Sequence, residues 1–240
     1  YNLWLAIALA LASGIVCGLI TSILVVRFKY HSLITTIAVS TIAKSVAAAI
    51  NAGMPLSAPV LKSAPLYRFI NRDVAGIPVI FIIVLVIYGV LLLIQEKTKY
   101  GQYVYAMGEN RQAVREAGVK EGKILGGIFI TSAFFAALAG VLMVFVVYGS
   151  GQPKMGSSFF LDGFTVVFLG AMVLKLGKSN VVGTFLGGIM LAMIVNGLTL
   201  MGANFAASQI IKGLLLVIGI VMVAFGQKKR RGKAGVLKYE

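Results

Sequence analysis

Acidic side chains are scarce in this chain of 240 residues, where seven Asp and Glu stand against 22 Lys and Arg. Charged residues make up 12% of the sequence and apolar residues 59%, whereas a soluble domain carries about 25% charged residues. This composition excludes an ordinary soluble domain. Long apolar runs recur along the chain and predict an all-α polytopic membrane protein, because a β-barrel would show short alternating segments instead.

Cysteine and histidine are also nearly missing, with Cys17 and His31 as the single examples. One cysteine excludes a disulfide framework or a cysteine metal site within the chain. The stretch LGKSN, 176–180, lacks the earlier glycine that a phosphate-binding loop requires. The sequence shows no convergent catalytic set, so we expect a chain that is not an enzyme and binds no cofactor or metal.

Seven apolar segments have, or nearly have, the roughly 20 residues that a membrane-spanning helix needs. The fifth is short and is expected to be a partial or re-entrant helix. We expect one transmembrane domain over residues 1–240, in a fragment whose start is missing, since the first residue is Tyr1 and not Met. The seven predicted spans are 3–26, 32–52, 76–95, 124–149, 159–174, 181–201 and 208–226.

Basic residues are distributed unevenly between the two sides of these spans. Sixteen Lys and Arg fall on one side, four on the other, and two, Lys44 and Lys212, within spans. Because Lys and Arg are retained in cytoplasmic loops, the loop 96–123 and the basic tail 227–240 are predicted to be cytoplasmic. The net charge of +15 is therefore attributed to topology and not to binding of nucleic acid.

Residues 109–117, ENRQAVREA, predict a short helix within the charged loop. Asn110 is a suitable cap at its start, and Gly118 can adopt the left-handed turn that ends it. Ala113 and Ala117 lie four residues apart on one face, where a helix of two to three turns could seat in a cleft of a soluble partner. The alternative is a solvated helix at the membrane interface.

Residues 100–119, YGQYVYAMGENRQAVREAGV, resemble the cytoplasmic coupling loop of ABC-importer permeases of the ribose type. Two positions, Gln102 and Val114, depart from that family's pattern. The segments 160–174, 183–202 and 208–222 resemble later parts of the family in the same order. The matching positions of the loop are Gly101, Tyr105, Ala106, Gly108, Asn110, Ala113, Gly118 and Val119.

The resemblance implies a non-catalytic permease subunit in the inner membrane of a bacterium, which crosses it several times and ends in the cytoplasm. It implies cytosolic ATPase subunits that carry ATP–Mg, a second permease subunit, and an external binding protein that delivers a monosaccharide. It also implies that roughly three spans are missing before Tyr1, and the topology predicts an odd number if the true N-terminus is cytoplasmic. The expected ATPase-coupling residues are Gly108, Glu109, Asn110, Arg111, Ala113, Arg115, Ala117, Gly118 and Val119.

Polar residues inside the predicted spans are candidates for the translocation path: Thr36, Ser40, Lys44, Asp162 and Asn196. The first three repeat every four residues and form one polar stripe, which lines a path or packs on a neighbouring span. The alternative is that the lysine snorkels and the hydroxyls bond to the backbone. Three roles stay open for the Asp162 carboxylate: pairing with Lys44, capping a helix from 163, or facing the outer mouth of the path. The Asn196 side chain is expected to form a hydrogen bond between helices.

Two pairs of small residues, Gly14 with Gly18 and Gly183 with Gly187, have the spacing that lets helix backbones approach closely. They predict packing and not chemistry. The loop 53–75 holds three of the five prolines and is expected to be ordered without being helical throughout. It is either a docking surface for an external partner or a plain connector.

Other functions stay open. The same architecture could carry a nucleoside, a branched-chain amino acid or a sugar-like signal molecule. An ion-coupled secondary transporter would show more carboxylates inside the membrane than Asp162. A membrane-embedded enzyme is disfavoured because no catalytic set converges.

Overall fold

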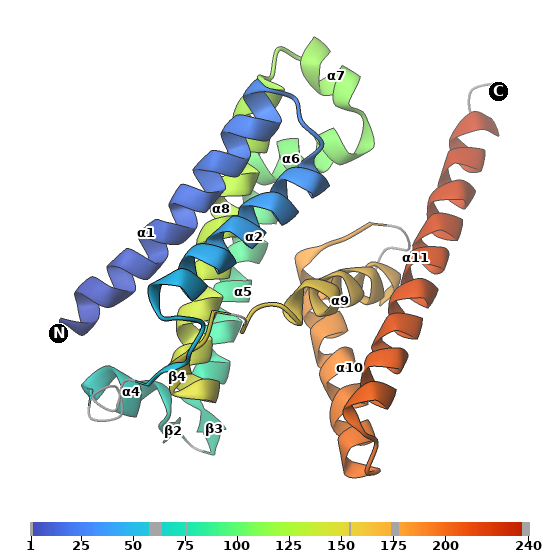
Figure 1. The fold of residues 1–240 in the computed structure, drawn as a ribbon. Coiled ribbons are helices and arrows are strands. Elements are labelled where there is room, and N and C mark those ends of the chain that lie inside the picture. Colours follow the sequence, from blue (N-terminus) through green and yellow to red (C-terminus); the bar gives the residue numbers. More distant parts are fainter. Residues whose placement is uncertain (1, 58–63, 75, 154, 174–177, 237–240) are drawn as a thin grey trace. The chain divides into compact units, whose positions relative to one another are not determined.

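The computed structural model describes residues 2–57, 64–74, 76–153, 155–173 and 178–236. Parts of the predicted loop 53–75 and tail 227–240, and the last residue of the predicted span 159–174, lie outside them. Helices dominate the described residues (Figure 1). They are α1 Leu3–Ser22, α2 Ser32–Ile50, α4 Pro65–Ile70, α5 Val79–Lys97, α6 Lys99–Glu109, α7 Arg111–Glu116, α8 Glu121–Met143, α9 Phe159–Val173, α10 Val181–Leu200 and α11 Phe205–Val236.

Two helical extensions and four short strands complete the described elements. A π-helical turn, η1 Ile23–Arg27, continues α1, and another, η2 Val144–Tyr148, continues α8. The strands are β1 Leu56–Ser57, β2 Asp73–Val74, β3 Ile77–Pro78 and β4 Ser150–Gly151. Strand β1 pairs antiparallel with β4, and β2 with β3.

The predicted class, an all-α polytopic membrane protein, is confirmed. In the described residues, six helices are long and apolar enough to cross a membrane, and they match six of the seven predicted spans with shifted ends. The seventh, α9, has 15 residues. At 1.5 Å per residue it is about 22 Å long, shorter than a hydrocarbon core of about 30 Å. The six long helices are Leu3–Arg27, Ser32–Ile50, Val79–Lys97, Glu121–Val147, Val181–Leu200 and Phe205–Gly226.

The chain divides into two compact units, the first formed by residues 1–87 and 93–156 and the second by 88–92 and 157–240. In the first unit, α1 packs along α8 with its glycines against alanines. A Cβ atom on Gly14 would overlap Ala137, and one on Gly18 would overlap Ala133. This close approach confirms the packing role predicted for the first glycine pair.

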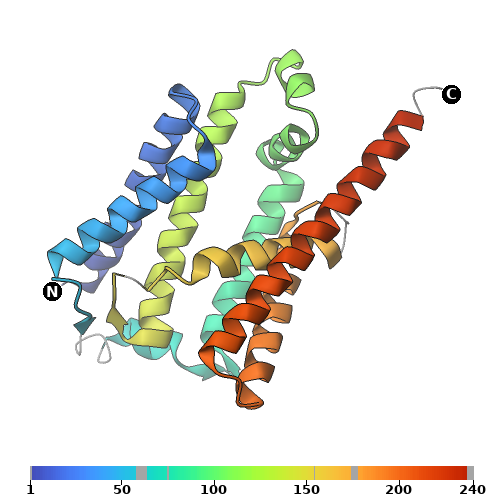
Figure 2. The same cartoon turned by 45° about the vertical axis from the view of Figure 1, so that its right-hand side comes forward.

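The two ends of the first unit are built differently. Helices α6 and α7 lie at one end of α1 and α8, and α4 lies with the strands at the other end (Figures 1 and 2). Leu56 pairs with Gly151 and Ser57 with Ser150, while the Asn71 amide donates to the Phe145 carbonyl at 3.1 Å. The described part of the loop 53–75 is therefore ordered against the end of α8 and not helical throughout, as predicted.

The second unit is built from α9, α10 and α11, and α9 runs crosswise to the other two (Figures 1 and 2). Added Cβ atoms on Gly170 and Gly183 would each meet the backbone of the other residue, and one on Gly187 would meet the backbone of Val166. The predicted close approach at the second glycine pair is thus confirmed. Replacing these glycines with larger residues would push α9 and α10 apart.

Two elements differ from the sequence-based prediction. The loop 96–123 contains the additional helix α6, and the short helix that follows covers Arg111–Glu116, which is less than two turns. Gly101 and Gly108 reduce the intrinsic helix propensity of α6, but packing within the unit overrides that preference. The last span begins three residues earlier than predicted, at Phe205.

Candidate functional site

Helix α7 is capped at both ends despite its length. The Asn110 side chain accepts hydrogen bonds from the backbone N–H of Gln112 at 3.0 Å and of Ala113 at 3.2 Å. Gly118 has φ +76°, a left-handed conformation that suits glycine. The predicted cap and the predicted glycine stop are both confirmed.

A hydrophobic anchor fixes α7 on its inner face. Val114 is 6% exposed and clusters with Met107 of α6 and Ile124 of α8, and the half-buried Val119 packs against them. The Val119 N–H also donates to the Val114 carbonyl at 3.2 Å, which closes the helix in a Schellman arrangement. Burying a valine stabilises by about 1.5–3 kcal/mol, so this contact is the main attachment of α7.

One carboxylate joins α7 to the start of α8. Glu121 lies in the first turn of α8, where a negative charge is favourable. Its Oε2 is 2.7 Å from Nη2 of Arg115 and accepts a 2.7 Å hydrogen bond from that residue's Nε, and its Oε1 is 3.6 Å from Nη1 of Arg111. The arginine side chains are 68% and 70% exposed and that of Glu121 15%. Exposed ion pairs contribute about 0–1 kcal/mol each, so they mainly fix the orientation of α7 on α8.

The turn between α5 and α6 is equally constrained. The Thr98 hydroxyl donates to the Ile94 carbonyl at 2.6 Å and accepts from the Gly101 N–H at 3.1 Å. The Tyr100 hydroxyl donates to the Ile124 carbonyl at 3.4 Å. Burial raises the pKa of the Tyr100 phenol, and a hydrogen bond with Thr131 lowers it by less. Helices α5, α6 and α8 are thus linked beneath α7.

Eight of the nine predicted coupling residues are exposed on the outward side of this assembly, whereas Val119 is half-buried against the inner cluster. The exposed residues are Gly108, Glu109, Asn110, Arg111, Ala113, Arg115, Ala117 and Gly118. The residues that hold this face in place were not predicted from the sequence. Val114 was noted only as a departure from a pattern, and Glu121 was not considered as a contact. Because the extended residue Asn110 separates α6 from α7, no helical spacing in the sequence indicated the contact between Met107 and Val114.

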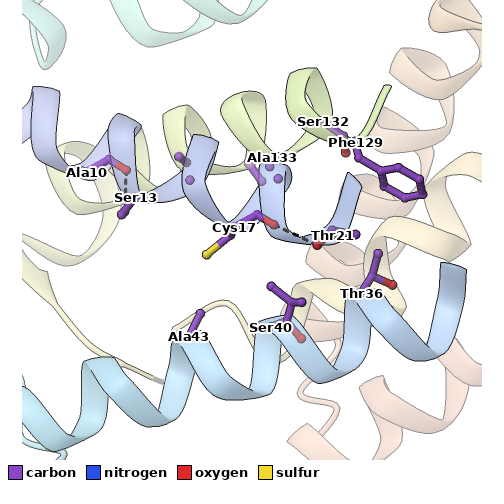
Figure 3. A pocket seen from close by; sticks show the side chains of 15 residues that line it. Ala10, Ser13, Cys17, Thr21, Thr36, Ser40, Ala43, Phe129, Ser132 and Ala133 are labelled. Carbon is purple, nitrogen blue, oxygen red and sulfur yellow. Dashed lines mark hydrogen bonds between the residues drawn. The ribbon is translucent and has the colours of Figure 1, made fainter. Parts of the chain in front are cut away.

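A groove of about 470 Å³ lies between α1, α2 and α8 in the first unit (Figure 3). The predicted path residues Thr36 and Ser40 line it, and Ser13, Thr21 and Ser132 add further hydroxyls. Alanine and glycine form much of the remaining wall, and the described lining residues include none with a charge.

Most of these hydroxyls donate to their own helices. Each of four hydroxyls donates a hydrogen bond of 2.8–3.0 Å to the backbone carbonyl three or four residues earlier. Bonding of the hydroxyls to the backbone was the alternative predicted for the polar stripe of α2. A hydroxyl that donates still has an oxygen lone pair with which to accept. The groove therefore offers hydrogen-bond acceptors. The four residues are Ser13, Thr21, Thr36 and Ser40.

Of the remaining path candidates, Lys44 lies in the first unit, and Asp162 and Asn196 lie in the second. Lys44 is half-buried one turn beyond Ser40, outside the groove lining. Asp162 pairs with Lys212 at 2.8 Å, and the two side chains are 19% and 18% exposed. Asp162 lies inside α9, so it does not cap a helix that begins at residue 163, and its partner within the second unit is Lys212. Asn196 is exposed on α10.

The pairing of Asp162 with Lys212 was not predicted. The sequence places Lys212 only within a span, whereas in the structure its Nζ donates to a carboxylate 50 residues away. The pair connects α9 to α11 within the second unit. Among the described residues, no group of three or more His, Cys, Asp or Glu is placed to hold a metal ion.

Comparisons with known proteins agree on one family. The family model described as branched-chain amino acid transport system / permease component matches residues 1–220. The ribose import permease protein of Haemophilus influenzae is 30% identical over 220 residues, covering 91% of this chain and 68% of that protein. The ribose import permease protein of Escherichia coli K12 is 28% identical over 223 residues, covering 92% and 69%.

The fructose import permease protein of Bifidobacterium longum is 30% identical over 224 residues, covering 93% of this chain and 63% of that protein. No solved structure gives a significant match. The resemblance to ribose-type importer permeases that the coupling loop indicated is confirmed over nearly the whole sequence. The chain therefore belongs to the permease-component family of the branched-chain amino acid transport type.

Proposed function

We propose that this chain is the membrane-spanning subunit of an ATP-driven importer and that α7 is the element through which an ATPase acts on it. The observation that carries the proposal is the docking of α7. The helix is capped at both ends, anchored through Val114 and tied to α8 through Glu121. A connecting loop needs none of these contacts, whereas a lever needs all of them.

Force on α7 would pass directly into a membrane span. Glu121 begins α8, which runs as an apolar helix to Val147 and packs along α1. ATP binding on a separate subunit can change the state of the path only through a contact that differs between the two states. A displaced α7 would move α8, and with it one wall of the groove.

We propose a monosaccharide of the ribose type as the cargo. Two relatives carry "ribose import" in their names and one carries "fructose import", and the groove offers acceptors to the many hydroxyl donors of a sugar. A branched-chain amino acid, which the family description names, is the second candidate. Its two charges would require counter-charges that the described groove lining does not provide. A nucleoside or a sugar-like signal molecule would share the sugar's hydrogen bonding.

The complete transporter would place this chain, as one transmembrane domain, in the inner membrane of a bacterium. Cytosolic ATPase subunits carrying ATP–Mg would bind α7, and the C-terminus would lie on the same side. A second permease subunit would complete the path. An external binding protein would meet the opposite end of the first unit, where α4 and the paired strands β1 and β4 lie.

The test uses the transporter reconstituted in proteoliposomes with its ATPase. Ala113→Trp fills the exposed face of α7, and Gly118→Pro removes the left-handed turn that closes it. Both should insert into the membrane normally but lose most ATP-driven uptake. Ala38→Trp, on the exposed face of α2, is the matched control. Full uptake by both α7 variants would refute the lever.

Cargo is tested in the same vesicles. ATP-dependent accumulation of ribose, competed by other monosaccharides and not by leucine, is the expected result. Accumulation of leucine would support the second candidate. Uptake driven by an ion gradient with ATP absent would instead indicate a secondary transporter.

A further inference from the structure

A second cavity lies beside α7, with a volume of about 680 Å³. The segment that joins α1 to α2 forms one side, and α7 with the start of α8 forms the other. Three cations, Lys29, Arg111 and Arg115, line it together with one carboxylate, that of Glu121. Because the two arginines share this one carboxylate, the lining retains an excess of positive charge.

Apolar side chains line the cavity beside these cations. They are Val25 and Val26 of η1 and Leu125 near the start of α8, and all three are half-buried. A free inorganic anion would gain nothing from these side chains. A ligand with an anionic head and an apolar body would use both kinds of lining.

Aromatic side chains mark the same place as an interface between membrane and water. Phe28 and Tyr30 stack with ring centroids 6.1 Å apart and are 59% and 60% exposed. Exposed aromatic residues at the ends of spans sit at the level of the lipid headgroups. The cavity therefore opens at the depth where phosphate groups of the bilayer lie.

The backbone of Lys29 supports a specific role for its side chain. Its φ is +56°, a left-handed conformation that glycine adopts without strain and that other residues adopt at a cost. The turn from η1 to α2 would form more readily with glycine. A lysine here retains a cation at the rim of the cavity in spite of that cost.

We propose that this cavity binds the phosphate headgroup of an acidic phospholipid, with the acyl region against Val25, Val26 and Leu125. Basic pockets between helices on the cytoplasmic side suit such headgroups. The bound lipid would bridge Lys29 of the α1–α2 connection and the two arginines of α7. This site is separate from the proposed path, and it shares Arg111 and Arg115 with the exposed face offered to an ATPase.

The test measures the thermal stability of the purified transporter in neutral detergent as phosphatidylglycerol, phosphatidylcholine or inorganic phosphate is added. Phosphatidylglycerol should raise the melting temperature in a saturable way, and the other two should not. Lys29→Gln should weaken its apparent affinity by about fivefold, the effect of one lysine near an anionic surface. Lys29→Arg should restore most of it. Lys97→Gln, which removes an exposed charge at the end of α5, should behave like the unaltered protein.

Each other outcome overturns the assignment. An equal response to inorganic phosphate would show a simple anion site, and an equal response to phosphatidylcholine would show no headgroup selectivity. An unchanged affinity in Lys29→Gln, or an equal loss in Lys97→Gln, would place the lipid elsewhere. The test requires no cargo and no ATP, so its result is independent of the proposed transport function.

Discussion

Truncating Val114 tests whether α7 must be docked in order to couple. Val114→Ala removes two carbon atoms from a site that is 6% exposed, and at about 0.8 kcal/mol for each buried carbon the loss is about 1.6 kcal/mol. The caps of Asn110 and Gly118 and the ion pairs of Glu121 remain. Helix α7 should therefore stay formed but spend more time detached from α6 and α8, with the detached fraction rising about 15-fold.

The assay compares uptake with ATP hydrolysis in the reconstituted transporter. Sugar accumulated per ATP hydrolysed should fall in Val114→Ala, and hydrolysis itself should fall less. Hydrogen exchange of the backbone amides of 111–116 should become faster by a comparable factor, because local opening limits it. Val46→Ala, the same truncation at a residue 55% exposed on α2, is the control.

Docking of α7 is irrelevant to transport if Val114→Ala and Val46→Ala give the same ratio of uptake to hydrolysis while exchange at 111–116 accelerates. Unchanged exchange would show instead that the valine is not the main anchor.

Three further predictions concern the membrane-embedded helices. Gly187→Leu should force α10 away from the α9 backbone and lower the yield of folded protein, since overpacking costs at least about 1–3 kcal/mol. Gly197→Leu is the control, because Gly197 has open space around it, and its yield should not fall. Equal yields of the two variants would contradict the close packing of α9 and α10. Asp162→Asn should destabilise the second unit by about 3 kcal/mol by leaving Lys212 unpaired. Adding Lys212→Met should recover much of the melting temperature, and no recovery would show that the pair is not the cause. Lys44→Met should lower transport more than it lowers expression, and equal losses would indicate a purely structural lysine.

The sequence predicted those features that depend on local chemistry. Span positions follow from the lengths of apolar runs, and their helices follow from the backbone's need for internal hydrogen bonds in lipid. The caps of α7 were predictable at Asn110 and Gly118 because each residue acts on its immediate neighbours. The close approach of α9 and α10 followed from the spacing of Gly183 and Gly187.

Features that depend on tertiary contacts were not predicted. Helix α6 contains two glycines and forms because Met107 and Tyr100 find partners on other helices. The partner of Asp162 lies 50 residues away, and residue spacing alone gave no reason to choose it. Glu121 pairs with the two arginines of α7 only because α7 folds back over the start of α8.

A proximity measurement tests the central claim, contact between α7 and an ATPase, most directly. Cys17 is the chain's one cysteine, so Cys17→Ser provides a background in which a photoreactive group can be attached to a new cysteine at Ala113. Irradiation of membranes that contain the assembled transporter should join this chain to the ATPase subunit. The same group at Met54, which is 66% exposed between α2 and β1, should not do so. A label at Ala113 that reacts only with lipid or water would contradict the account.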